Sequence, residues 1–281
     1  MDIKELKIMA NQIRRDVVDL VTKIEPGHVG GSLSICDVIT ALYFEIMNVS
    51  PERKDDPNRD RFILSKGHCT EVYMCTLANR GFIQKESLLK YCNYLSPYCA
   101  HPSKDIDGVE ASTGSLGHGL SLACGMALSG KKSKADYKVY TILGDGELAE
   151  GSNWEAAMFA NKYKLDNLYA ILDRNGLQIS GSTEDVMPLN PLKEKWEAFG
   201  FYVEEIKGND METVVETFKK LESIKDKPKL ILANTIKGKG VSFMENQVKW
   251  HEGTLNQKEY ETAMKDLDKI DELLKGGKDH E

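Results

Sequence analysis

The sequence has no apolar run long enough to cross a bilayer, and its amino-terminal stretch MDIKELKIMANQIRRDVVDL carries charges throughout, unlike a signal or transit peptide. Basic residues do not dominate, because 37 lysines and arginines stand against 44 acidic residues, a net charge of -7. The short cluster KKSK at 131–134 is expected to be a solvated loop, and no nucleic-acid or membrane partner is expected. With 281 residues and 41% hydrophobic content, the chain is expected to be a globular, cytoplasmic protein.

The sequence also lacks any CxxC pair, although it has six cysteines. Three of them lie within apolar helical patterns: Cys36, Cys75 and Cys124. In a chain of intracellular character they are expected to be reduced core thiols rather than disulfides. Cys92, Cys99 and His101 could suggest zinc, but their spacing matches no common structural site, so zinc is not expected.

Strand patterns alternate with helical patterns in the second half of the chain. Strands are expected at 139–143, 168–173, 202–206 and 229–234, and helices at 152–163, 192–199 and 211–224. Before them, helices are expected at 6–21, 35–47 and 116–128, a short strand at 62–64, and a functional loop without periodicity at 92–115. This order predicts an α/β fold: a doubly wound parallel sheet with helices on both faces. A single domain over 1–281 is expected, with covering helices at the amino terminus and a carboxy-terminal helix at 257–275 whose apolar stripe must cover something.

An aspartate lies where a phosphate-binding loop is expected. In GDGELAEG, Asp145 follows one predicted strand, and Asn175 follows the next. The carboxyl ends of neighbouring parallel strands meet at one edge of a sheet, where ligands bind. An aspartate repels phosphate unless a cation lies between them, and carboxylate and amide oxygens suit Mg²⁺ or Ca²⁺. The pattern therefore predicts a divalent cation that joins Asp145 and Asn175 to a diphosphate, with Gly146 allowing close approach of the backbone.

Two other interpretations of these residues remain open. GDGELA also fits the loose dinucleotide pattern GxGxx[GA]. Asp145 argues against it, because a nicotinamide site contacts the pyrophosphate without a metal and places its ribose-binding acid about 20 residues on, sooner than Asp173. The plainer alternative is that GDG is only a turn and Asn175 a cap.

Six separated motifs together resemble transketolase. They are GHVGGSLS, SKGHC, TGSLGHG, GDGELAEGSNWEA, DRNGLQI, and IKGKGVSF with KWHEG, in the family's order from His28 to His251. Transketolases are about twice as long as this chain, which resembles their amino-terminal, thiamine diphosphate-binding half. The resemblance implies a transferase of the pentose phosphate pathway that moves a two-carbon ketol unit between sugar phosphates. It also implies thiamine diphosphate and Mg²⁺ as cofactors, with Ca²⁺ or Mn²⁺ as possible substitutes.

The resemblance further implies roles for individual residues. Magnesium is expected on the side chains of Asp145 and Asn175 and on the backbone carbonyl of Leu177. The diphosphate is expected near Gly146, His68, His251 and Lys237, and the rings of the cofactor near Gly114, Leu116 and Ile179. The family's substrate-channel histidines match His28, His68, His101 and His251. Of these, His28 and His251 are expected to move protons or contact hydroxyls, and His101 to contact the donor. The two remaining histidines are His118 and His280, and the latter lies in the tail.

The sequence departs from the family at His118, where many transketolases have glutamine. Both residues donate a hydrogen bond, but histidine titrates near neutral pH, so the role of His118 is open. Glu150 matches an acidic position that lies, in the family, at the interface between active sites. The alternative for Glu150 is a capping or first-turn role at its helix.

The parts of the family's active site that lie in a second domain have no counterpart in this sequence. They include a glutamate that activates the aminopyrimidine and basic residues that bind the sugar phosphate. A separate carboxy-terminal subunit that carries the pyrimidine-binding domain is therefore expected, in a heterotetramer with two copies of each chain. The open alternatives are another thiamine enzyme, similar to deoxyxylulose phosphate synthase or to a transketolase for an unusual sugar, a non-catalytic thiamine diphosphate-binding paralogue, and a nicotinamide oxidoreductase.

Overall fold

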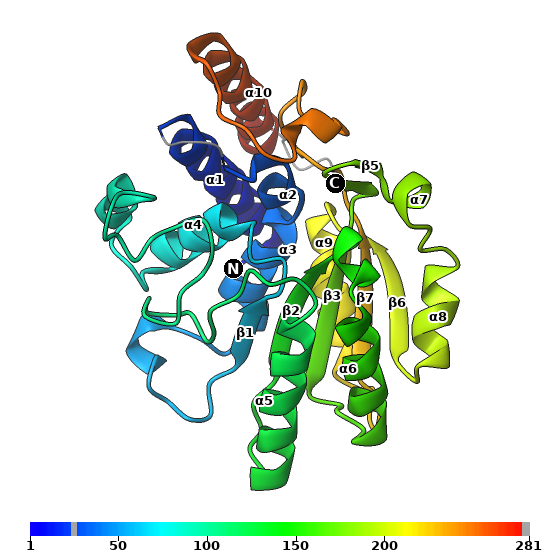
Figure 1. The fold of residues 1–281 in the computed structure, drawn as a ribbon. Coiled ribbons are helices and arrows are strands. Elements are labelled where there is room, and N and C mark those ends of the chain that lie inside the picture. Colours follow the sequence, from blue (N-terminus) through cyan, green and yellow to red (C-terminus); the bar gives the residue numbers. More distant parts are fainter. Residues whose placement is uncertain (24–26, 277–281) are drawn as a thin grey trace.

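A five-stranded sheet lies at the centre of the computed structural model, which describes residues 1–23 and 27–276 and therefore leaves His280 outside (Figure 1). The strands, in spatial order, are β1 (Arg61–Leu64), β2 (Val139–Gly144), β3 (Leu168–Arg174), β7 (Lys229–Asn234) and β6 (Tyr202–Lys207). Every neighbouring pair is parallel. The central strands are buried almost throughout, as expected for apolar runs in a sheet that is covered on both faces. The predicted fold class and all five predicted strands are confirmed.

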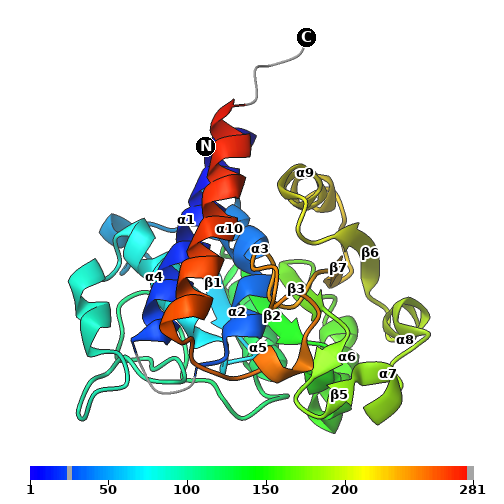
Figure 2. The same ribbon diagram turned by 90° about the horizontal axis from the view of Figure 1, so that it is seen from above.

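Helices cover both faces of the sheet, because successive strand residues point to opposite sides. Tyr140 and Ile142 pack in one core with α1 (Ile3–Thr22), α3 (Cys36–Ala41), α4 (Thr70–Arg80) and α9 (Met211–Leu221). Val139 and Leu143 pack in the other core with α5 (Gly119–Ser133), α6 (Gly151–Lys162) and α8 (Leu192–Ala198). The view from above shows the two helical layers on either side of the strands (Figure 2).

The last helix, α10 (Gln257–Gly276), covers α1 rather than the sheet, and the two lie side by side in both views (Figures 1 and 2). Its predicted apolar stripe supplies the contact, with Leu267 fully buried. Polar bonds fix the pairing: Asn11 donates to the Leu267 carbonyl at 2.9 Å, and Arg15 pairs with Asp268 at 2.7 Å and Asp271 at 2.9 Å. The partner of the stripe is therefore the amino-terminal helix of the same chain.

The boundaries of some elements differ from the prediction. The helix expected at 116–128 begins only at Gly119, because the backbone at Gly117 has a φ of 83°, which no helical residue adopts. The helix expected at 35–47 is α3 followed by a π-helical turn, Leu42–Ile46. Three short elements lie where none is expected: α2 (Val29–Ser34), the hairpin of β4 (Leu177–Gln178) and β5 (Gly181–Ser182), and α7 (Thr183–Val186).

The loop predicted at 92–115 is confirmed, since it contains turns but neither helix nor strand. All six cysteines are free, and the three that were predicted in helical cores are buried. Within the residues that the structure describes, no helix is both long and apolar enough to span a bilayer.

Candidate active site

A cavity of about 310 Å³ opens at the carboxyl ends of β2 and β3. Asp145 follows β2 and Asn175 follows β3, and the two strands are in register there, with Gly144 opposite Asp173. Every predicted site residue except His101 lines this cavity: His28, His68, Gly114, Leu116, Asp145, Gly146, Asn175, Leu177, Ile179, Lys237 and His251. His101 lies just behind the wall, because a Cβ on Gly114 would come within 2.7 Å of its ring. Four segments that are distant in sequence thus meet at one edge of the sheet.

The Asp145 carboxylate is almost fully buried and faces backbone donors. Its oxygens accept from the amides of Gly146 at 2.8 Å and Gly176 at 2.6 Å, and Arg174 lies 3.3 Å away. Burial, and after it the negative charge of Asp173, raises the pKa of Asp145 above its ordinary value. A cation at this position would offset both effects, because it favours the ionised carboxylate.

The two other predicted metal ligands lie close by and are both engaged. The Asn175 amide donates to Asp173 at 2.7 Å, while its oxygen accepts from the Leu177 amide at 3.1 Å. The Leu177 carbonyl accepts from Lys237 Nζ at 3.2 Å, a bond that a metal ion would have to replace. Among the described residues, no three His, Cys, Asp or Glu side chains gather as a metal site. One carboxylate, one amide and one carbonyl oxygen nevertheless fit a hard cation that takes its remaining ligands from water and phosphate.

Three histidines form the opposite part of the cavity. The ring centroids of His28, His68 and His251 lie 5.0 to 5.6 Å apart, and two of the three pairs are edge-on. Burial, and then the charge of Lys66, lowers the pKa of His68 to about 2, and burial, and then Lys237, lowers the pKa of His251 to about 3. Burial also lowers the pKa of His28. The expectation of histidine pKa values near the working pH is therefore wrong for the ligand-free cavity, because desolvation and two nearby lysines keep these rings neutral.

The neutral rings still have open positions for a ligand. The Nδ1 atom of His28 is buried and has no hydrogen-bond partner. Lys237 Nζ lies 2.9 Å from His251 Nδ1, and an ammonium group can only donate, so Nδ1 accepts and Nε2 carries the proton. A bound diphosphate would satisfy such donors, and its negative charge would raise the pKa of the histidines that it contacts.

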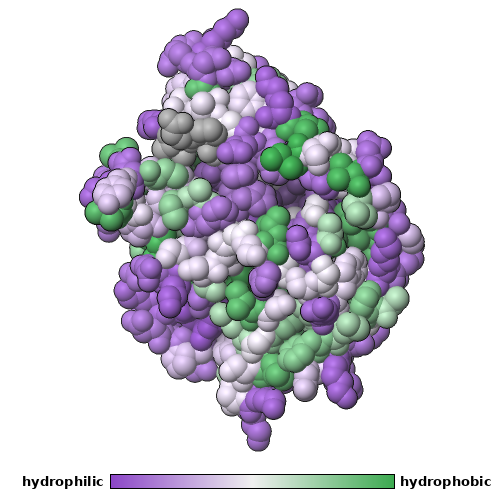
Figure 3. Space-filling view, viewed as in Figure 1, coloured by the Kyte–Doolittle hydropathy of each residue, from purple (hydrophilic) through white to green (hydrophobic). Residues whose placement is uncertain are grey.

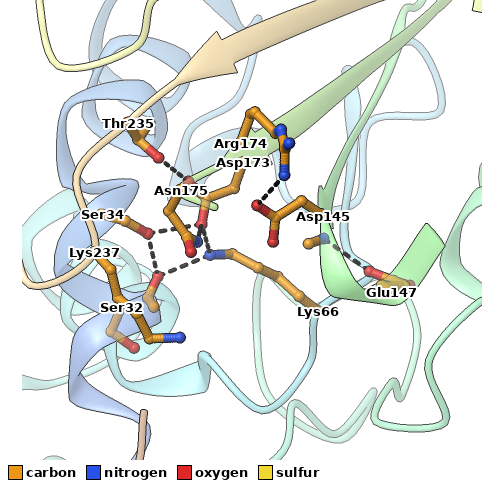
Figure 4. Close-up of polar contacts among 12 residues, drawn as sticks. Ser32, Ser34, Lys66, Asp145, Glu147, Asp173, Arg174, Asn175, Thr235 and Lys237 are labelled. Carbon is orange, nitrogen blue, oxygen red and sulfur yellow. Dashed lines mark hydrogen bonds and ion pairs between the residues drawn. The ribbon is translucent and has the colours of Figure 1, made fainter. Parts of the chain in front are cut away.

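Behind the cavity lies a buried polar cluster, which the sequence reasoning missed (Figure 4). Lys66 pairs with Asp173 at 2.6 Å, and both side chains are buried. Glu147, also buried, accepts from the amides of Gly117 and Gly144 at 2.8 and 2.9 Å and thereby joins two loops of the site. The signal in the sequence is that charged residues directly end or follow strands that are otherwise apolar, as in FILSK and AILD.

The two residues with an open role lie at the rim. His118 is exposed, and its Nδ1 lies 3.2 Å from the Leu116 carbonyl. Glu150 occupies the cap position of α6 but makes no side-chain capping bond, so the capping alternative is wrong. It is exposed and free to contact another molecule.

Comparison with known proteins matches residues 6–269 to the family described as "Transketolase, thiamine diphosphate binding domain". One of the two subunits that make up an apulose-4-phosphate transketolase from Phocaeicola vulgatus is 46% identical over 276 residues, which cover 98% of each chain. A 6-deoxy-6-sulfo-D-fructose transketolase subunit from Clostridium sp. is 41% identical, over 94% of this chain and 97% of the relative.

Longer proteins match over less than half of their length. Human transketolase is 37% identical over 89% of this chain but only 40% of its own. The crystal structure of a Campylobacter jejuni transketolase superposes with a TM-score of 0.90 and 31% identity, over 95% of this chain and 43% of that one.

Proposed function

The chain belongs to the transketolase family of enzymes, and from that premise we propose that it is the thiamine diphosphate-binding, amino-terminal subunit of a split transketolase. Together with a second subunit, it transfers a two-carbon ketol unit from a ketose phosphate to an aldose phosphate. The observation that carries this proposal is the pair of length ratios. Relatives named as subunits match over nearly their whole length, whereas human transketolase matches over 40% of its length.

The cavity residues would hold thiamine diphosphate and Mg²⁺. Asp145, Asn175 and the Leu177 carbonyl supply oxygens for the metal ion, while Lys237 and the neutral His68 and His251 lie where the diphosphate is expected. Gly114, Leu116 and the largely exposed Ile179 line the part that is expected to contact the rings. When bound, thiamine diphosphate supplies the acidic thiazolium carbon that takes up and releases the two-carbon unit.

The histidines supply proton transfer and hydroxyl contacts. His251 presents Nε2–H as a donor, because Lys237 occupies its other nitrogen. His28 offers a buried Nδ1 that can accept a hydrogen bond or a proton from a substrate hydroxyl. His101, exposed beside Gly114, is placed to contact the donor sugar.

A partner surface is supported by an exposed apolar face on α5 and α6. Leu122 is 41% exposed, Met158 57%, Phe159 37% and Tyr163 42%, and apolar residues gather over these helices in the space-filling view (Figure 3). Contiguous exposed apolar surface of this kind marks interaction sites. We assign this face, together with Glu150 at the start of α6, to the subunit that carries the pyrimidine-binding domain. A heterotetramer with two copies of each chain is the assembly we propose.

Two further features of the whole chain are proposals. Residues 1–281 form one domain, which is supported by the packing of helices from both ends of the chain on one sheet. The protein acts in the cytoplasm, which is supported by its free thiols, because two of them, Cys92 and Cys99, are exposed and unpaired.

A transketolase for a less common sugar is the second candidate. It is favoured by the names of the relatives, one of which refers to apulose 4-phosphate and another to 6-deoxy-6-sulfo-D-fructose. The residues that bind the rest of the sugar are expected on the partner subunit, so the substrate of this chain depends on that subunit.

The test is ketol transfer by the affinity-tagged chain, alone and as isolated from its host with any bound subunit. Xylulose 5-phosphate, apulose 4-phosphate and 6-deoxy-6-sulfofructose serve as donors, with thiamine diphosphate and Mg²⁺ present. Activity only in the isolated complex supports the split enzyme, and the preferred donor selects between the two candidates. Full activity of the chain alone, or none with any donor in a complex that binds the cofactor, contradicts the proposal.

A further inference from the structure

We propose that Asp173, held in place by Lys66, is a positioning residue that fixes the orientation of the Asn175 side-chain amide. The fixed orientation keeps the amide oxygen available to the metal ion. This inference rests on the proposed function, since it concerns the metal site of that function. Figure 4 shows Lys66, Asp173 and Asn175 in contact, on segments that include both ends of the cluster.

An asparagine side chain can be placed in two ways, which exchange its oxygen and its nitrogen, and its neighbours decide between them. Asp173 Oδ2 accepts from Lys66 Nζ at 2.6 Å, and an ammonium group has no acceptor. An oxygen that accepts from Lys66 carries no proton at that position, so the Asn175 group 2.7 Å from it must be the NH₂. The Asn175 oxygen therefore lies on the other side, where it accepts from the Leu177 amide.

Asp173 is itself held from several directions. Ser34 donates to Oδ2 at 2.7 Å, and Thr235 donates to Oδ1. Lys66 in turn donates to the Gly31 carbonyl at 2.8 Å. Asp173 is completely buried, so no water competes for these bonds. Because Asn175 receives its orientation from a carboxylate that cannot move, the metal-binding oxygen is in place before any cation arrives.

The decisive variant is Asn175→Asp, which keeps the size of the side chain and the oxygen that faces the metal. If only charge mattered, a second carboxylate would bind Mn²⁺ more tightly. We expect it instead to bind about tenfold or more weakly, because the new carboxylate cannot donate to Asp173 and is repelled by it. Exchanging the two residues, in Asp173→Asn with Asn175→Asp, restores a donor and an acceptor and should recover most of the loss.

Thr235→Val is the matched control. It removes a hydrogen bond to the other oxygen of Asp173 but touches neither Asn175 nor the cavity. We expect its Mn²⁺ affinity to stay within about twofold of the wild type, in line with the loss of one remote bond. Thermal melts verify that each variant folds.

The measurement is Mn²⁺ titration followed by electron paramagnetic resonance, with thiamine diphosphate present, on the tagged chain isolated with its partner subunit. Wild-type affinity in Asn175→Asp, or no recovery in the double variant, overturns the inference. A wild-type complex that binds neither Mn²⁺ nor thiamine diphosphate overturns the proposed function instead, which separates the two failures.

If Asn175→Asp does not fold, hydrogen exchange decides the question on the wild-type chain. The side-chain NH₂ of Asn175, observed by ¹⁵N nuclear magnetic resonance, should exchange slowly with water because it donates to a buried carboxylate. Exchange as fast as that of an exposed asparagine contradicts the inference.

Discussion

Lys229 allows the electrostatics of burial to be tested away from the active site. It lies at the amino end of β7, at the edge of the sheet opposite to the cavity, and is 1% exposed. Its Nζ donates to the Asp166 carbonyl and lies 4.5 Å from the Tyr169 ring. Burial, offset only in part by Asp166, lowers the pKa of Lys229 from 10.5 to about 8. The same cause, desolvation of a cation, lowers the pKa values of His68 and Lys237 in the cavity.

The magnitude follows from that pKa. A pKa lowered by this amount corresponds to roughly 3.4 kcal/mol of unfavourable free energy at neutral pH, which solvent screening reduces to about 2 kcal/mol. Lys229→Met removes this penalty but also a hydrogen bond of about 1 kcal/mol. We therefore expect the variant to be more stable than the wild type by about 1 kcal/mol at pH 7, or roughly 2 °C in Tm for a chain of this size.

The sign of the pH dependence is the sharper part of this prediction. The pKa of Lys229 in the folded chain, about 8, lies below its unfolded value of 10.5, so between these limits the folded state binds fewer protons than the unfolded state. The stability of the wild type must then rise as the pH increases from 8 to 10.5. Lys229→Met lacks this rise, so its advantage at pH 7 disappears near pH 10.

Urea unfolding at pH 7 and pH 10 measures both quantities. Lys219→Met, at an exposed position on α9, is the control, and its stability relative to the wild type should be the same at both pH values. Ketol transfer should be unaffected by Lys229→Met, because the residue is remote from the cavity. A variant that is less stable than the wild type by an equal amount at both pH values would refute the reasoning.

Three further predictions concern the proposed function. Asp145→Ala should abolish Mn²⁺ binding in the presence of thiamine diphosphate, as measured by paramagnetic resonance, because it removes the one carboxylate among the proposed ligands; undiminished binding would exclude Asp145 as a ligand. His251→Ala should lower kcat by about 100-fold or more while metal affinity changes by less than about threefold, as expected for loss of proton transfer; equal losses of both would undo its assignment. Met158→Glu on α6 should prevent co-purification of the second subunit, whereas Leu273→Glu, on the exposed side of α10, should not; co-purification with both would place the partner elsewhere.

The sequence predicts the sheet well because its strands are short apolar runs between turn residues, and a parallel sheet that is covered on both faces requires such runs. The convergence of Asp145 and Asn175 follows from the same rule. The helix α2 is different: VGGSLS contains two glycines and two serines, which are poor helix formers, and the helix exists because all six residues are buried against the rest of the chain. Local propensity gives no signal for an element that tertiary packing forms.

The positioning residues of the site were within reach of the sequence, although the motifs did not reveal them. A parallel sheet brings the ends of β1, β2 and β3 to one edge, so Lys66, Asp145 and Asp173 had to lie near one another once the strands were assigned. A charged residue at the end of a buried run cannot stay unpaired, and opposite charges at the same edge are the available partners. Lys66 and Asp173 are 107 positions apart in the sequence, yet this reasoning pairs them. What the sequence could not supply is the direction of each hydrogen bond, and the orientation of the Asn175 amide depends on that direction.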